Sequence, residues 1–193
     1  MTKEEKKQKE ESARQFLLKN GWDLRKSTPK DTDAICSAFV TGISCNPIRG
    51  VRVKGVCGCG KTMALSMLYR VRTNGLAVII ECSNADQVEA LQNAIDFDLR
   101  YNRNGGIVIL DDLGREPKIN FKDSHEIIGS YICRKYSAWK QGVGGGIAIT
   151  TNLNATGEGS ILTLYGDHVL SRIAEMTVGI QLEAKDQREF MTA

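Results

Sequence analysis

Several features typical of membrane, secreted and zinc-binding proteins are missing from this sequence. No apolar run approaches the roughly 20 residues that cross a bilayer, and the charged residues 1–7 are not followed by the hydrophobic stretch of a signal peptide. The six cysteines show no paired CxxC spacing of the kind that binds zinc. We therefore expect a cytoplasmic protein that does not contact a membrane and whose thiols are reduced and mostly structural.

The chain also has little net charge. Its formal charge of +3 is too small to demonstrate a polyanionic partner, although Lys and Arg outnumber Asp and Glu in residues 1–30. Nucleic-acid binding is permitted by this composition but not required by it. With 193 residues, of which 41% are hydrophobic, the chain can bury one main core and a short appendage.

Short apolar segments alternate with longer amphipathic ones, a pattern that predicts an α/β domain with a mostly parallel sheet. The expected strands are 51–54, 77–81, 107–111, 146–151 and 178–183, and the expected helices between them are 61–72, 86–101, 123–141 and 167–175. Two further helices are expected before the first strand, one over 1–20 and one that starts at Asp31 or Thr32 as its cap. We divide the chain into a charged helical appendage, 1–45, and a core domain, 46–193.

The strongest motif is a glycine-rich loop between the first expected core strand and its helix. It fits the pattern GxxxxGK[ST] with the residues Gly55, Val56, Cys57, Gly58, Cys59, Gly60, Lys61 and Thr62. The backbone N–H groups of such a loop wrap phosphates, the lysine reaches the β- and γ-phosphates, and the hydroxyl of Thr62 holds Mg²⁺. We expect this loop, together with Met63, to bind ATP.

A second motif follows an apolar strand that ends in two carboxylates, Asp111 and Asp112. This is a Walker B pattern, in which Asp111 belongs to the Mg²⁺ shell and Asp112 orients or deprotonates the attacking water. Taken alone, paired aspartates after a strand can also form a turn or a helix cap.

The next expected strand ends in Thr150, Thr151 and Asn152. Asn152 is our candidate for a side chain that senses the γ-phosphate, because strand ends of this kind meet beside the phosphate loop. The alternative is that Asn152 caps the following helix.

These motifs together resemble an AAA+ ATPase of the group that contains the helicase loaders DnaC and DnaI and the transposition helper IstB. The matching residues extend over most of the chain. They are Arg49-Gly50-Val51 with the phosphate loop, residues 109–116, residues 150–153, Tyr165-Gly166-Asp167, residues 171–176 and residues 183–188.

The resemblance implies a three-layer P-loop NTPase of AAA+ type with a central five-stranded sheet and no C-terminal helical lid. It implies that Arg172 is an arginine finger that completes the ATP site of a neighbouring subunit, in a nucleotide-dependent ring or spiral. It also implies slow, Mg²⁺-dependent ATP hydrolysis that assembly or DNA stimulates, binding of single-stranded DNA, and a replicative helicase or a transposase as client. Two residues depart from the pattern: His168 stands where a second arginine is more usual, and Asp112 where many relatives have glutamate.

A helicase loader is the leading interpretation and an IstB-like helper the close alternative. A third possibility is an ATP-binding interaction protein that barely hydrolyses ATP, and a small-molecule kinase is more remote because no arginine-rich lid is evident between Asp111 and Asn152. Basic and aromatic residues within 118–140, including Lys135, Lys140 and Trp139, are compatible with DNA contacts. An ordinary amphipathic helix with aromatic core anchors explains the same residues.

Overall fold

A five-stranded parallel sheet forms the centre of the molecule in a computed structural model, which describes residues 1–22, 28–72, 78–83, 93, 106–116, 118–119, 122–143 and 145–184. Its strands are β1 (Gly50–Lys54), β2 (Val78–Glu81), β3 (Val108–Leu113), β6 (Ile147–Thr151) and β7 (Thr177–Gln181). They lie in the order β2-β3-β6-β1-β7, and every neighbouring pair is parallel. The central strands read as apolar runs because helices cover both faces of the sheet, and all five residues of β6 are buried.

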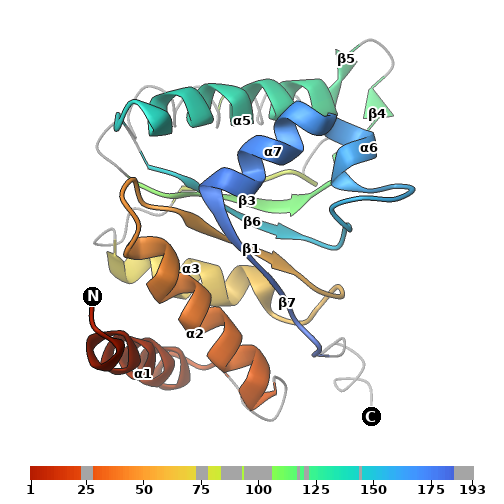
Figure 1. The fold of residues 1–193 in the computed structure, drawn as a ribbon. Coiled ribbons are helices and arrows are strands. Elements are labelled where there is room, and N and C mark those ends of the chain that lie inside the picture. Colours follow the sequence, from red (N-terminus) through yellow and green to blue (C-terminus); the bar gives the residue numbers. More distant parts are fainter. Residues whose placement is uncertain are drawn as a thin grey trace, which may run out of the picture.

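Helices cover the two faces in separate groups, as Figure 1 shows. On one face lie α1 (Lys3–Lys19), α2 (Pro29–Ile43) and α3 (Lys61–Arg72); on the other lie α5 (Ser124–Lys140), α6 (Ile161–Tyr165) and α7 (Asp167–Met176). Each face has its own hydrophobic cluster. This arrangement confirms the three-layer α/β fold with a central, mostly parallel five-stranded sheet that the sequence predicts. None of the helices in the described ranges is long and apolar enough to cross a membrane.

Some elements differ from the sequence-based expectation. Helix α2 begins at Pro29 and not after Asp31 or Thr32, because the Oγ1 atom of Thr28 accepts a hydrogen bond from the backbone N–H of Asp31 and Pro29 occupies the first helical turn. The short helix α6 and the two-stranded antiparallel sheet of β4 (Lys118–Ile119) and β5 (Lys122–Asp123) were not predicted. The helix expected over 86–101 lies outside the described residues, apart from residue 93.

The first two helices share a core with the central sheet. Leu17 of α1 and Ile35 of α2 are fully buried, in the same cluster as Val51 and Val53 of β1. A side-chain oxygen of Asp31 also accepts a hydrogen bond from the backbone N–H of Glu183, which follows β7. The domain boundary at residue 45 stays a prediction, but the segment before it contributes side chains to the hydrophobic cluster of the sheet.

Candidate nucleotide-binding site

The candidate site lies where three neighbouring strands end. Strand β6 lies between β1 and β3, so the loop after β1, the carboxylates at the end of β3 and the polar end of β6 share one edge of the sheet. In a parallel sheet this carboxyl edge is where ligands bind. The sheet order therefore brings together three motifs that are about 40 to 100 residues apart in the chain.

The glycine-rich loop has the backbone that its sequence predicts. Gly58 and Gly60 have φ angles of 74° and 86°, a left-handed conformation that residues with a Cβ atom rarely adopt. Helix α3 starts directly after the loop, at Lys61. The free N–H groups and the positive dipole end of this helix therefore lie beside the loop, as a phosphate site requires.

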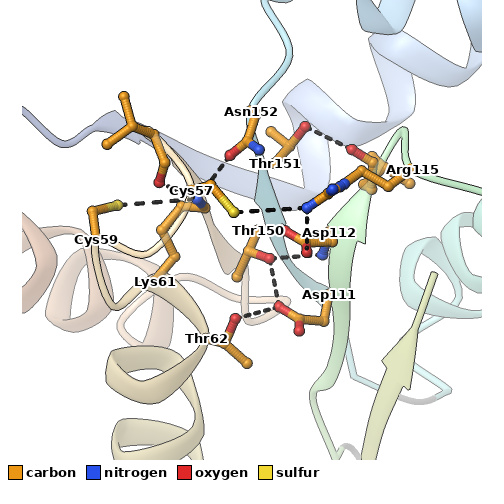
Figure 2. A network of polar contacts seen from close by, with 12 residues as sticks. Cys57, Cys59, Lys61, Thr62, Asp111, Asp112, Arg115, Thr150, Thr151 and Asn152 are labelled. Carbon is orange, nitrogen blue, oxygen red and sulfur yellow. Dashed lines mark hydrogen bonds and ion pairs between the residues drawn. The ribbon is translucent and has the colours of Figure 1, made fainter. Parts of the chain in front are cut away.

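Lys61 joins the loop to the end of β6. Its Nζ atom donates hydrogen bonds to the carbonyl oxygens of Gly55 and Val56, at 2.9 and 2.8 Å, and to Oδ1 of Asn152, at 2.8 Å. Figure 2 shows the side chain of Lys61 directed from α3 toward Asn152. Lys61 is buried, and these three acceptors are neutral carbonyl and amide oxygens. A phosphate can therefore replace them without breaking an ion pair to any of the three.

Oxygen atoms suited to Mg²⁺ gather at Asp111. Its Oδ1 atom accepts hydrogen bonds from the hydroxyl of Thr62 at 2.5 Å and from the hydroxyl of Thr150 at 2.6 Å. Carboxylate and hydroxyl oxygens are hard ligands of the kind that Mg²⁺ prefers, usually together with water and substrate phosphates. The donor set of Thr62 and Asp111 therefore fits the metal that the sequence motifs imply.

Asp112 is held in an unusual backbone conformation. Its φ angle is 53°, and Asp112 has the only positive φ of any non-glycine residue among those described. Its N–H group donates to Oγ1 of Thr150 at 2.8 Å, so Thr150 contacts both aspartates. Such strain costs on the order of 1–3 kcal/mol and is concentrated at functional sites.

Arg115 lies beside the side-chain carboxylate of Asp112. Its Nη1 atom lies 3.5 Å from Oδ2 of Asp112 and 3.7 Å from Sγ of Cys57 in the phosphate loop (Figure 2). The guanidinium group thus spans the space between the two motifs. Sequence reasoning assigned no role to Arg115 or to Thr150, because both contacts depend on the spatial order of β3, β6 and the loop.

Glu116, which follows Arg115 in the chain, is a buried acid. Oε2 of Glu116 accepts a hydrogen bond from the N–H of Gly114 at 3.0 Å and lies 3.0 Å from Nδ1 of His125, while Oε1 accepts a hydrogen bond from the hydroxyl of Tyr165. Burial and the charge of Glu116 raise the pKa of Tyr165, so this hydroxyl stays protonated and donates. Glu116 therefore ties the turn after β3 to helices α5 and α6.

The remaining predicted loop contacts differ in exposure. Val56 and Met63 are exposed, at 51% and 43%, and so are accessible to a ligand. Cys59 is buried, and this burial raises the pKa of its thiol. Cys57 is half-buried, and all six cysteines are free thiols. The expectation of reduced, mostly structural thiols fits these surroundings.

Arg172 lies apart from the residues around Lys61. It belongs to α7, and its Nη1 atom contacts Sγ of Cys133 at 3.2 Å, while the guanidinium group lies 5.5 Å from the ring centre of Tyr136. Both contacts are with α5. No hydrogen bond or ion pair joins Arg172 to the phosphate loop or to Asp111 within the described part of the chain.

Several basic and aromatic side chains of α5 are buried in the domain or paired with other residues of it. Trp139 is buried and its Nε1 atom donates to the carbonyl of Ile48 at 2.7 Å, and Lys135 is also buried. Lys140 forms an ion pair with Glu175 at 2.6 Å. The amphipathic-helix interpretation is therefore the better one for these three residues.

Comparisons with known proteins give a likeness in structure and none in sequence. No protein-family profile matches the sequence, and no curated protein matches it. Among solved structures, the chain is similar to the crystal structure of the DnaC helicase loader, with 21% sequence identity and a TM-score of 0.49. The likeness covers 70% of this chain and 78% of that one.

Proposed function

We propose that this protein is an AAA+ ATPase that binds and hydrolyses ATP and acts with DNA, as a helicase loader does. The observation that carries the proposal is the meeting of Lys61, Asp111 and Asn152 at one edge of the sheet, beside a glycine-rich loop and a helix N-terminus. Each of the three comes from a different strand–loop unit. Their convergence is what phosphoryl transfer needs, since that reaction depends on positioning and on charge stabilisation.

In this proposal the chain's own residues have distinct roles. The loop N–H groups and Lys61 bind the β- and γ-phosphates, while Asn152 moves from Lys61 to the γ-phosphate. Thr62 and Asp111 hold Mg²⁺, which neutralises phosphate charge when it is bound. Asp112, whose main chain is anchored by Thr150, orients the attacking water and accepts its proton.

The assembly and the partners belong to the same proposal. Arg172, on the helical layer opposite α3, completes the ATP site of a neighbouring subunit in a ring or spiral. Single-stranded DNA and a replicative helicase are the proposed partners, in the cytoplasm, and a transposase is the alternative client.

The decisive test is steady-state ATP hydrolysis with and without single-stranded DNA. Lys61→Ala should abolish nucleotide binding, and Asp112→Asn should keep binding but lower kcat about a hundredfold, the order expected for loss of a general base. Lys7→Ala, an exposed change on α1, is the control for loss of a lysine. Negligible hydrolysis in every sample, with or without DNA, would refute the proposal that this protein hydrolyses ATP.

One observation favours a second candidate, an ATP-binding interaction protein with negligible hydrolysis. The carboxylate of Asp112 faces Arg115, so the base is engaged by a cation in this structure. If nucleotide binds tightly while wild type and Asp112→Asn hydrolyse it equally slowly, this second function is the correct one.

A further inference from the structure

A groove of about 320 Å³ lies on the sheet beside strands β1 and β7, separate from Lys61 and Asp111. We call it the β1–β7 groove. Its lining includes Arg52, Lys54, Asn154, Gly179 and Gln181. Strand β7 is the edge strand of the described sheet, so the groove lies at one side of that sheet.

Strand alternation places the two cations of the groove on one face. Val51 and Val53 point into the core cluster that includes α2 and α3, and both are fully buried. Arg52 and Lys54 therefore point to the opposite face. They are two residues apart on one strand, so their side chains lie next to each other.

Neither cation is paired with a carboxylate in the described part of the chain. Arg52 is half-buried, its burial lowers the pKa of the guanidinium group, and no described residue forms a hydrogen bond or ion pair with it. Lys54 donates only to neutral amide oxygens among the described residues, Oδ1 of Asn154 at 2.5 Å and Oε1 of Gln181 at 3.3 Å. Two positive charges thus share a groove to which no described residue brings a compensating carboxylate.

The backbone opposite Arg52 leaves space for its side chain. Gly179 of β7 is in register with Arg52, and a Cβ atom at this position would lie 2.9 Å from Nη2 of Arg52. The glycine therefore permits the guanidinium group to lie over the edge strand. A planar guanidinium and an ammonium beside amide N–H₂ groups form a set of donors that matches phosphate oxygens.

From this geometry we infer that the β1–β7 groove is a second anion site, which binds a phosphate group between Arg52 and Lys54. The phosphate can belong to a single-stranded DNA backbone or be free phosphate. The inference rests on the proposed function only where the phosphate belongs to single-stranded DNA. Because β7 is the edge strand of the described sheet, successive phosphates of a polymer backbone can extend past the groove, which favours this source.

The test uses the full chain and two phosphate probes. The first is a fluorescein-labelled oligo(dT), followed by fluorescence anisotropy at several salt concentrations. The second is inorganic phosphate, followed by calorimetry in a Lys61→Ala background so that the phosphate loop does not contribute. The double variant Arg52→Gln/Lys54→Gln removes both cations, and Lys6→Gln/Arg14→Gln removes two cations that already pair with Glu10 and Asp33.

If DNA supplies the phosphate, the groove variant should weaken oligonucleotide binding more than tenfold at about 0.1 M salt and reduce the salt slope by about 0.7, the value for one phosphate contact on a single strand. The control pair should change neither. Gly179→Asp, which places a carboxylate against Arg52, should weaken binding with both cations still present. If only inorganic phosphate binding is lost, the site holds free phosphate.

Unchanged binding of both probes in the groove variant overturns the inference. So does a wild type that binds neither probe, or a groove variant that loses only nucleotide-driven assembly, since the cations would then pair with a neighbouring subunit. A fluorescent ATP analogue is titrated into the same samples. Absence of nucleotide binding by wild type would refute the proposed ATPase, whereas loss of oligonucleotide binding alone in the groove variant would not.

Discussion

Arg115 lies between the glycine-rich loop and Asp112 in the candidate ATP site. Sequence motifs assigned no role to this residue. Its guanidinium group contacts Asp112 on one side and Cys57 of the phosphate loop on the other. A cation in this position can stabilise the negative charge that develops on the transferred phosphoryl group. Its pairing with Asp112 can also restrain the base before nucleotide binds.

These two roles of Arg115 predict opposite outcomes. We expect Arg115→Ala to bind ATP through Lys61 as wild type does, but to lower kcat by on the order of a hundredfold, as loss of one stabilising donor does elsewhere. Arg115→Lys should restore part of the rate. Steady-state kinetics that separate kcat from KM make the measurement. A kcat that rises in Arg115→Ala would mean that the arginine chiefly restrains Asp112.

At the scale of elements, the contacts of Glu116 hold the turn after β3 against two helices. The carboxylate of Glu116 contacts Gly114, His125 and Tyr165 and so links the exit of β3 to α5 and α6. Gly114 has a φ of 96°, and a Cβ atom there would approach Cδ1 of Leu153 to 2.2 Å. The turn that carries Asp112 therefore has little freedom to move alone.

Helix α1 gives a direct test of how the first residues relate to the core. Leu17 is fully buried with residues of α2 and β1, so Leu17→Ala should lower the free energy of unfolding by about 3 kcal/mol. The exposed change Lys7→Ala on the same helix should alter it by less than about 0.5 kcal/mol. Urea denaturation followed by two probes measures both. An unchanged unfolding transition in Leu17→Ala would show that residues 1–45 are an independent appendage.

At the scale of the whole molecule, the candidate ATP site and Arg172 lie on different parts of the chain. Arg172 is held against α5 by Cys133 and Tyr136, and no described contact links it to Lys61 or Thr62. An arginine placed in this way can act on the nucleotide of another subunit. The proposed ring or spiral depends on this separation.

Assembly should therefore respond to Arg172 while nucleotide binding should not. In sedimentation with Mg²⁺ and a non-hydrolysable ATP analogue, wild type should form oligomers and Arg172→Ala should weaken their association at least tenfold, since loss of a charged interface contact costs about 2 kcal/mol or more. Lys19→Ala, an exposed change on α1, is the control. Monomers in every nucleotide-bound sample would favour the interaction-protein alternative.

The sequence by itself determined the parts of this protein that depend on neighbouring residues. The glycine-rich loop, the strand ending in Asp111 and Asp112, and the alternation of strands and helices were readable because glycine conformation and hydrophobic periodicity act over a few residues. The tertiary structure decided the rest. Only the position of β6 between β1 and β3 sets Asn152 against Lys61 and Thr150 against both aspartates. Likewise, the groove cation Arg52 and its glycine neighbour become visible only once β7 is in register with β1, because contacts between distant strands depend on sheet order.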